Sequence, residues 1–267
     1  MAKFEKFLIT KNLAKNTVNA YVHTIETFKK EKRRFEKSSL LSWKAEMIET
    51  YKGKTVNQKI QAMNNYLDCI GKPELKLKAI KVQQKTYLEN VISDADYSFL
   101  KKQLKKEENL QWYFIVRFLG ATGARISELI KVKVEHVKNG YIDLYTKGGK
   151  IRRIYIPSAL QKELLPWLEN DLKMTSGYIF LNRFGRSISA RGIAQQLKRF
   201  AKKYGIDSKV VYPHSFRHRF AKNFLEKYND IALLADLMGH ESIETTRIYL
   251  RKTASEQQEI VNKIVTW

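Results

Sequence analysis

Apolar side chains recur at helical spacing through residues 1–70 of the chain. Over residues 18–29 they return every three or four positions, which places them on one stripe of a helix: Val18, Tyr21, Val22, Ile25 and Phe28. The same spacing predicts helices over residues 40–51 and 56–70. Residues 1–75 are therefore predicted to form an N-terminal helical domain.

Capping and breaking residues place the boundaries of these elements. Asn16 or Thr17 is the predicted N-cap of the helix that follows it, because a short polar side chain can accept the free amides of a first helical turn. Residues 76–91 are lysine-rich and weakly periodic, which favours a linker between domains. A second domain, residues 92–267, is predicted to begin with a helix that starts near Ser93, at Ser93-Asp94-Ala95-Asp96.

The second domain combines helical patterns with one patch of strand pattern. Residues 141–145 and 153–156 alternate between apolar and polar side chains, and Lys147-Gly148-Gly149-Lys150 forms a turn between them. These features predict a β-hairpin with a basic tip, and 178–181 is a candidate third strand. Helical spacing predicts further helices over 112–119, 190–204, 215–227, 231–238 and 243–250. The expected fold class is mainly α with a small β-sheet.

The charge of the chain indicates a polyanionic partner. The formal net charge is +23 over 267 residues. Residues 1–90 hold 19 Lys and Arg against 9 Asp and Glu, and residues 91–267 hold 31 against 18. Because both halves are basic, no single tail explains the excess, and neutralisation of DNA phosphates is the favoured explanation.

Cysteine content and the absence of long apolar runs limit the cellular compartments and the kinds of metal site that fit the sequence. Cys69 is the one cysteine, so an internal disulfide and a Cys-rich zinc site are both excluded. No signal peptide or membrane-spanning run is recognisable in the sequence, which excludes a membrane partner. We expect a cytoplasmic protein that needs no cofactor and no metal, since no Asp/Glu cluster has metal-ligand spacing.

Four short segments of the second domain carry the candidate chemistry. Each could be structural on its own, because surface arginines and half-buried tyrosines are common. In order they give Arg…Lys…His-x-x-Arg…Gly-His…Tyr, and this order resembles the tyrosine recombinase, or phage integrase, family, most closely its Xer-like branch. The resemblance extends to Phe4–Tyr21, which is similar to the start of that family's helical core-binding domain. The matching residues are Arg125, Lys147, His214, Arg217, Gly239, His240 and Tyr249.

By this resemblance the chain joins a helical, SAM-like core-binding domain to a mixed α/β catalytic domain. It would cleave and rejoin duplex DNA through a 3′-phosphotyrosine intermediate, for integration, excision or resolution. The implied partners are DNA with inverted-repeat core sites, three further copies on two DNA sites, and accessory proteins; the free protein would be a monomer. The catalytic residues would be Arg125, Lys147, His214, Arg217, His240 and Tyr249, and we expect DNA contacts from Lys11, Lys15, Asn16, Thr17, Lys150 and Arg191.

The residue types suit metal-free cleavage of a phosphodiester. A tyrosine has a pKa of about 10, so nearby cations must favour its phenolate. The forked guanidinium groups of Arg125 and Arg217 match the oxygens of a phosphorane-like transition state. Lys147 can protonate the leaving 5′-oxygen, with Lys150 as the rival for that role. His214 either donates to the phosphate or accepts the tyrosine proton, and the sequence leaves this choice open.

Several secondary residues have two interpretations. Glu128 is expected to orient Arg125, whereas His218 and Arg219 serve either DNA contact or packing. The chain departs from the family at Tyr228-Asn229-Asp230, where Gly is frequent, and at Arg251, where His is frequent. These departures concern the subfamily, because neither position takes part in the chemistry.

The C-terminal tail is predicted to be an amphipathic helix with Ser255 as its N-cap. It docks either on its own domain or on a neighbouring protomer, and the resemblance favours the neighbour, because related recombinases exchange this segment around a ring. The apolar stripe consists of Ile260, Val261, Ile264, Val265 and Trp267.

Two other functions are compatible with the same residue set. A type IB topoisomerase-like enzyme would relax DNA instead of exchanging strands, and a catalytically silent regulator would only bind it. The product, relaxed DNA or a recombinant junction, separates the first alternative from recombination. The complete set of six candidate catalytic residues argues against the second.

Overall fold

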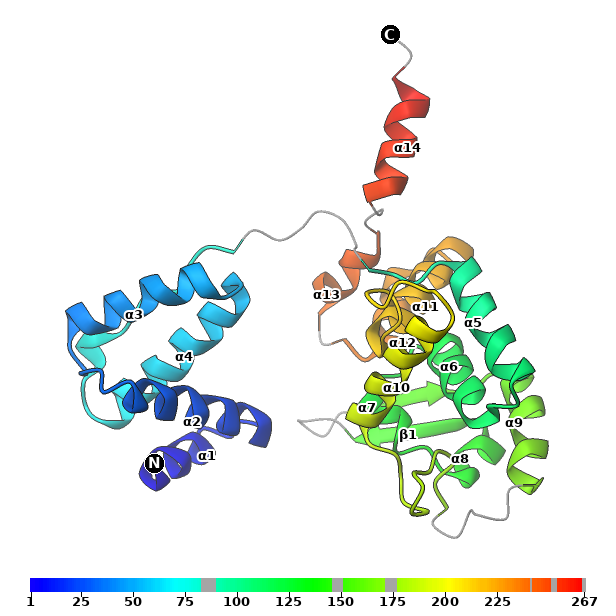
Figure 1. Ribbon diagram of the computed structural model, residues 1–267, viewed down its shortest axis with the longest axis horizontal. Helices are drawn as coiled ribbons and strands as arrows, with labels where there is room; N and C mark the ends of the chain where they lie inside the picture. The colour runs from blue at the N-terminus through cyan, green and yellow to red at the C-terminus, as the bar shows by residue number, and fades with distance from the viewer. Residues whose placement is uncertain (83–89, 146–150, 171–176, 241, 251–253, 266–267) are drawn as a thin grey trace. The chain divides into compact units, whose positions relative to one another are not determined.

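The computed structural model describes residues 1–82, 90–145, 151–170, 177–240, 242–250 and 254–265. The chain divides into two compact units, Met1–Gln84 and Lys85–Trp267, each with its own hydrophobic core (Figure 1). The predicted fold class is confirmed, because most described residues are helical and the one named sheet among them has two strands. No helix in these described ranges is long and apolar enough to cross a membrane.

The first unit is a group of four α-helices, as the apolar spacing predicts. They are α1 (Ala2–Thr10), α2 (Lys15–Lys30), α3 (Lys37–Thr50) and α4 (Gly53–Cys69), followed by the short 3₁₀ helix η1 (Pro73–Leu75). Their apolar stripes meet in one core, which holds Phe4, Leu8, Ile25, Phe28, Leu40, Met63 and Leu67. Burial of these faces is the main source of stability for helices of this length.

The predicted N-cap of α2 is wrong. The helix begins at Lys15, so Asn16 and Thr17 lie inside its first turn, and Ala14 occupies the N-cap position without a side-chain hydrogen bond. Ala14 has extended backbone angles, φ −62° and ψ 143°, which let the helix start two or three residues earlier than the polar side chains suggested. The start therefore follows from the backbone path after α1 and not from a local cap.

Two asparagines of α4 hold the segment that follows η1. The amide of Asn64 both donates to the Leu77 carbonyl and accepts from the Leu77 amide, each at 2.9 Å. Asn57 makes the same pair of bonds to Ile80, at 2.9 and 2.8 Å. Because an asparagine side chain carries a donor and an acceptor, it can imitate a neighbouring strand. Residues 76–80, part of the segment interpreted as a linker, thus pack on the first unit.

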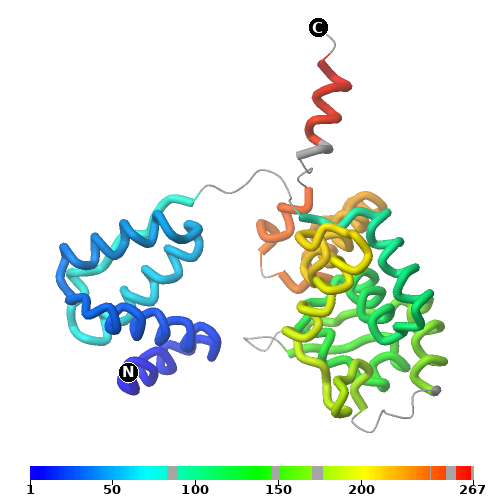
Figure 2. Tube along the Cα trace, viewed as in Figure 1, coloured from blue at the N-terminus to red at the C-terminus, as the bar shows by residue number. Residues whose placement is uncertain are grey.

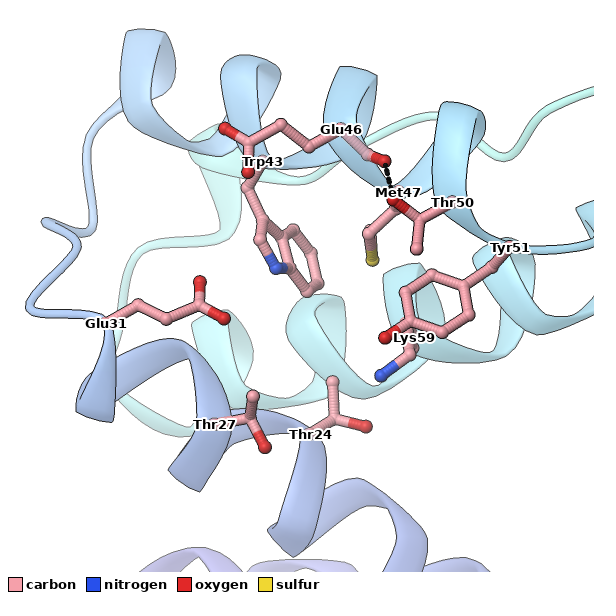
Figure 3. Close-up of a pocket in the computed structure, with 9 residues that line it drawn as sticks. All are labelled: Thr24, Thr27, Glu31, Trp43, Glu46, Met47, Thr50, Tyr51 and Lys59. Atoms are coloured by element: carbon pink, nitrogen blue, oxygen red, sulfur yellow. Dashed lines mark hydrogen bonds between the residues drawn. The ribbon is translucent and has the colours of Figure 1, made fainter.

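A pocket on the first unit lies among α2, α3 and α4 (Figure 3). Its two carboxylates belong to Glu31 and Glu46, and both pair with Arg33. The Thr50 hydroxyl donates to the Glu46 carbonyl at 2.8 Å, and the Lys59 ammonium lies 4.9 Å from the centre of the Tyr51 ring. These internal contacts explain the polar lining as part of the domain's own packing.

The described residues of the second unit are mainly helical and include one β-hairpin. Before the hairpin come α5 (Asp94–Lys106), α6 (Leu110–Thr122), α7 (Ile126–Leu129) and α8 (Val134–Asn139). The strands β1 (Tyr141–Tyr145) and β2 (Ile151–Tyr155) pair antiparallel, with Tyr141 opposite Tyr155 and Tyr145 opposite Ile151. Figure 2 traces the course of the chain through the elements of this unit. After them come α9 (Ser158–Asn170), α10 (Ala190–Lys203), α11 (Pro213–Lys227), α12 (Ile231–Met238), α13 (Ile243–Arg247), η2 (Ile248–Leu250) and α14 (Ala254–Ile264).

Several predictions from local sequence patterns are confirmed in this unit. Helix α5 begins where predicted, and Ser93 caps it, because its hydroxyl accepts the Asp96 amide at 3.0 Å. The predicted hairpin and the helices after residue 190 are also present. The candidate third strand over 178–181 is wrong, since Tyr178 and Leu181 form only isolated bridges, to Lys133 and Ser187. A strand needs a continuous ladder of partners, and this segment meets a different neighbour at each end.

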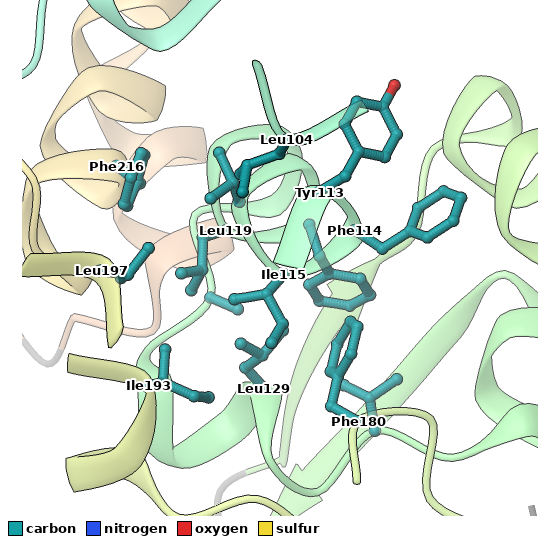
Figure 4. Close-up of a cluster of buried hydrophobic side chains, with 14 of the residues drawn as sticks. Leu104, Tyr113, Phe114, Ile115, Leu119, Leu129, Phe180, Ile193, Leu197 and Phe216 are labelled. Carbon is teal, nitrogen blue, oxygen red and sulfur yellow. The ribbon is translucent and has the colours of Figure 1, made fainter. Parts of the chain in front are cut away.

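The core of this unit positions the candidate site. Helix α6 is apolar on nearly every face and lies at the centre of the cluster in Figure 4, with Ile115 and Leu119 fully buried. Helix α11 packs directly on α6, and its Phe216 is also fully buried. The buried Ser215 hydroxyl accepts the Ile92 amide at 2.7 Å. The start of the second unit is therefore anchored beside the segment that carries His214 and Arg217.

Candidate active site

Three arginines converge on the C-terminal end of α12. The last carbonyls of a helix have no partner within it, and they carry the negative end of the helix dipole. Here each of three successive carbonyls accepts a guanidinium hydrogen bond. The pairs are Arg152 to Leu237 at 2.9 and 3.2 Å, Arg217 to Met238 at 2.6 Å, and Arg125 to Gly239 at 3.0 Å. The helix end thus gathers three positive groups from distant parts of the sequence.

Two glycines make this convergence sterically feasible. Gly239 ends α12 with a φ of 60°, and a Cβ at this position would overlap the Arg152 side chain. Gly123 ends α6 with a φ of 61°, and its carbonyl accepts the Arg217 guanidinium at 2.6 Å. Both positions therefore favour glycine for its left-handed conformation and for the space that it leaves, since a Cβ at Gly123 would overlap the Phe220 ring.

Arg125 is held by Glu128 at the first turn of α7. Its backbone amide donates to Glu128 Oε2 at 2.6 Å and its Nη1 donates to Oε1 at 2.9 Å. Burial acts to raise the pKa of Glu128, but the positive charge of Arg152 and the hydrogen bonds from Arg125 outweigh it and lower that pKa. Glu128 is therefore a carboxylate that orients Arg125, as expected, while the Arg125 side chain stays about one-third exposed.

Arg217 is the buried centre of the site, with only 2% of its surface exposed. It lies in the first turns of α11 and bonds the carbonyls of Gly123 and Met238. Burial, followed by the charges of Arg125 and Arg152, lowers the pKa of its guanidinium to about 10. It remains a cation at neutral pH, already oriented by the backbone of two different segments.

The contacts of His240 define its tautomer. Its Nε2 lies 3.0 Å from an Arg217 nitrogen, and its Nδ1 lies 2.8 Å from the hydroxyl of the buried Thr246. Because a guanidinium can only donate, Nε2 must be the acceptor, and the proton is therefore on Nδ1 and donated to Thr246. Burial and the charge of Arg217 lower the pKa of His240 to about 4, so the ring is neutral at pH 7.

Tyr249 lies between two histidine rings. It stands in η2, is 6% exposed, and packs within a small cluster that includes Leu225 and Met238. Its ring centroid is 6.3 Å from that of His240 and 5.4 Å from that of His218. Burial raises the pKa of Tyr249, and the charge and hydrogen bonding of Arg217 act in the opposite direction. The phenol thus lies beside Arg217, which together with the charge of Arg125 favours its ionised form.

Of the two remaining candidate catalytic residues, the structure describes His214 but not Lys147. His214 is exposed at the second position of α11, and desolvation by the surrounding protein and then the charge of Arg217 lower its pKa. Lys147 and its rival Lys150 lie outside the described residues. The structure therefore brings four of the six together: Arg125, Arg217, His240 and Tyr249.

Of the two residues with open roles, Arg219 has a packing role. Its guanidinium lies 4.0 Å from the Tyr97 ring centre and pairs with Asp94 at 2.5 Å. His218 adjoins Tyr249, and its buried Nδ1 has no hydrogen-bond partner within the described ranges. Burial, then the charges of His214 and Arg217, lowers the pKa of His218 to about 4.

The expected DNA-contacting residues are in different environments. Lys11 is held within its own unit, donating to Asn65 at 3.0 Å and pairing with Asp68 at 3.7 Å. Lys150 lies outside the described residues, and Thr17 is partly buried. Lys15, Asn16 and Arg191 are exposed, and so is Lys11 despite its contacts with Asn65 and Asp68.

The sequence motifs did not indicate Arg152 as a site residue. It donates to both Glu128 and Leu237 and is 5% exposed. A signal for it exists in the sequence: Arg152 has the same strand parity as Ile154, so the alternation of β2 places a charged residue on the buried face. A buried arginine needs a partner, which makes this position a candidate for a structured ion pair.

Comparison with known proteins identifies the family. Residues 75–256 match the model of the phage integrase family. The chain is 28% identical over 270 residues to the tyrosine recombinase XerA of Pyrococcus horikoshii, an alignment that covers 98% of this chain and 92% of that protein. It is 37% identical over 143 residues to the tyrosine recombinase XerC of Lactobacillus delbrueckii subsp. bulgaricus, covering 51% of this chain and 48% of that protein.

Solved structures share the fold. The Tn1549 transposon integrase in complex with circular intermediate DNA superposes with a TM-score of 0.73 at 18% identity, over 96% of this chain and 98% of that one. The crystal structure of XerA recombinase gives a TM-score of 0.56 at 20% identity, over 100% of this chain and 98% of that one.

Because the family match spans more than half of its length, the chain belongs to the phage integrase family. Within that family it is a tyrosine recombinase of the Xer-like branch, and hence a site-specific recombinase. These similarities give no support to a type IB topoisomerase or to a silent DNA-binding regulator.

Proposed function

We propose that this recombinase cleaves DNA with Tyr249 as its nucleophile and Arg125, Arg217 and His240 as its phosphate-binding groups. The observation that supports this most strongly is the link between Arg217 and the two residues beside it. Arg217 hydrogen-bonds His240 at 3.0 Å and favours the phenolate of Tyr249. A buried cation that contacts both the candidate nucleophile and a neutral histidine is suited to phosphoryl transfer.

In the proposed reaction, the Tyr249 oxygen forms a bond to phosphorus while the bond from phosphorus to the 5′-oxygen breaks. Negative charge on the non-bridging oxygens is stabilised by Arg125 and Arg217. The phenolic proton leaves to a base, for which His214 is the candidate, and Lys147 donates a proton to the departing 5′-oxygen. A 5′-hydroxyl of the partner strand then attacks the phosphotyrosine, so that each ester bond is replaced by another.

His240 requires a rearrangement if it is to donate to phosphate. In its present tautomer Nε2 accepts from Arg217, and Nδ1 donates to Thr246. When a phosphate oxygen takes over the Arg217 hydrogen bond, Nε2 must gain a proton before it can donate. The Thr246 hydroxyl suits this change, because a hydroxyl can accept from Nδ1 in one tautomer and donate to it in the other.

DNA binding is proposed to use the basic face of α10 together with the start of α2. The exposed residues of α10 include Arg191, Lys198, Arg199 and Lys202, whereas its Ile193 and Leu197 are fully buried. Such a helix presents one charged face to a polyanion. A DNA substrate and the free thiol of Cys69 also favour the cytoplasm as the place of action.

Assembly on DNA is proposed to involve four protomers on two sites with inverted repeats, and exchange of α14 between protomers. Three apolar residues of this tail support the exchange, because they are uncovered: Val261 is 51% exposed, Ile264 60% and Val265 45%. An apolar stripe on a terminal helix gains stability when a neighbour covers it. The tail would then make the position of Tyr249 depend on the presence of correct neighbours.

A plasmid with two candidate sites tests this function. Incubation of the supercoiled plasmid with the protein should give four-way junctions and recombinant circles. Relaxed circles without recombinants would contradict strand exchange and favour the swivelling reaction of a topoisomerase. Mass photometry of the complex on two sites should show four protomers, and a stable complex of any other number would contradict the proposed assembly.

A further inference from the structure

Arg152 is a buried charge that the proposed mechanism does not use. It stands on β2, and its side chain points to the buried side while the adjacent Arg153 points outward and pairs with Asp143 at 2.7 Å. Arg152 is 5% exposed. A guanidinium is expensive to remove from water, so its burial requires a specific set of partners.

Those partners belong to the candidate site. Arg152 Nη1 donates to Glu128 Oε1, the same oxygen that receives Arg125 Nη1 at 2.9 Å. Its Nε and Nη2 donate to the Leu237 carbonyl, two residues before the Gly239 carbonyl that accepts Arg125. Arg152 therefore shares both supports of Arg125, the carboxylate and the helix end.

The sharing has an electrostatic consequence. Arg125, Arg152 and the ionised Glu128 together carry one net positive charge. If Arg152 were neutral, Glu128 would pair with Arg125 alone, and the two charges would cancel. The guanidinium of Arg125 would then attract a phosphate more weakly, and it would be drawn toward the carboxylate.

Steric room for this contact is built into the chain. Gly239 precedes His240 directly, and any Cβ at Gly239 would overlap the Arg152 side chain. The glycine of the Gly-His pair thus has a second role besides its left-handed backbone. It lets Arg152 pass beneath the segment that carries His240.

We propose that Arg152 is a positioning residue for cleavage: its charge offsets that of Glu128, so that the positive charge of Arg125 remains available to the phosphate. This inference rests on the proposed function, since it assigns to Arg125 the task of stabilising charge on the non-bridging oxygens. Arg152 itself is buried behind Arg125 and Glu128, and acts through them.

The test compares Arg152→Met with Arg153→Met, which changes the neighbouring arginine of the same strand on its exposed side. Single-turnover cleavage is measured on a normal phosphodiester and on a methylphosphonate, in which a methyl group replaces one charged oxygen. We expect Arg152→Met to cleave the phosphodiester about 100-fold more slowly, the size typical of a misplaced catalytic group. On the methylphosphonate the same variant should approach the rate of Arg153→Met, because less charge needs stabilisation.

Two further variants keep the test decisive if Arg152→Met does not fold. Arg152→Lys retains the charge, whereas Arg152→Gln retains a donor without charge. The Arg152→Lys variant should cleave the phosphodiester at least about tenfold faster than the Arg152→Gln variant. On the methylphosphonate the two variants should cleave at similar rates. Equal rates for these two variants, or an Arg152→Met defect of the same size on both substrates, would overturn the proposal. Failure of the wild-type protein to form any Tyr249 adduct would instead overturn the proposed function.

Discussion

The imidazole of His240 lies nearly parallel to the phenol ring of Tyr249, with 6.3 Å between the ring centroids and 11° between the ring planes. The same imidazole accepts a hydrogen bond from Arg217. Three residues from α11, the end of α12 and η2 are thereby joined into one unit. A change at any of them is therefore expected to alter the other two.

Stability should depend on pH through His218 and His240. Both have a pKa of about 4 in the folded protein, against an ordinary value of 6.5. The unfolded chain therefore binds more protons between these values, so stability is full above about pH 6.5 and falls as pH drops toward 4. Thermal melting between pH 7 and 4.5 should show this decline. His218→Gln should flatten it, whereas His23→Gln, at an exposed position of α2, should leave the wild-type slope.

The role of Lys147 can be separated from that of Arg125 by changing the leaving group. Lys147→Ala should slow cleavage by about 10²-fold or more, because the 5′-oxygen then leaves without a proton. A substrate with sulfur at that position should restore the rate, since a thiolate leaves unprotonated. Arg125→Ala should gain nothing from the sulfur. Restoration of both variants, or of Lys150→Ala in place of Lys147→Ala, would contradict the assignment.

Affinity for DNA should fall steeply as salt rises, and α10 should contribute to that slope. Lys198 and Lys202 lie one helical turn apart, and both are exposed. Replacing both with Ala should reduce the slope of log Kd against log salt by about two, if each neutralises one phosphate. Lys203→Ala is the matched control, because its ammonium already pairs with Glu107 at 2.5 Å. Equal slopes for the double variant and wild type would place the DNA-binding face elsewhere.

Much of the fold could be predicted from the sequence, because its signals are local. The stripe from Val18 to Phe28 and the helix start near Ser93 involve only residues within one element. Helix α9 was not predicted, and it has Pro166 inside it, a residue that normally indicates a break. The short α7 and α8 likewise lack enough length to show a period.

The candidate site also combines features that the sequence could predict with features that it could not. The motif residues could be named from their order, but their mutual contacts could not. Arg152 and Leu237 are 85 positions apart, and only the folded chain brings them together. Thr246 was overlooked for a similar reason, since its role follows from the orientation of the His240 ring. Long-range partners of buried polar groups are the part that spacing does not reveal.

We predict that the C-terminal tail is needed for the pairing of two DNA sites but not for binding to one site. Deleting residues 255–267 should leave binding to a single site nearly unchanged, because the exposed α14 residues make no core of their own. Pairing of two sites and recombination should fall together, as measured by gel shift with one and with two sites. If the truncated protein recombines at the wild-type rate, the tail has no role in assembly. A deleted protein that unfolds would favour docking of the tail on its own domain.

Covalent capture on a nicked suicide substrate tests the nucleophile most directly. The nick lets the strand beyond the cleavage point diffuse away, so the protein remains attached to DNA and can be digested and mapped by mass spectrometry. We predict that the adduct maps to Tyr249. It should persist in Tyr228→Phe, a change at an exposed tyrosine, and be absent in Tyr249→Phe, which should bind DNA with unchanged affinity. An adduct retained by Tyr249→Phe, or mapped to any other residue, would contradict the account.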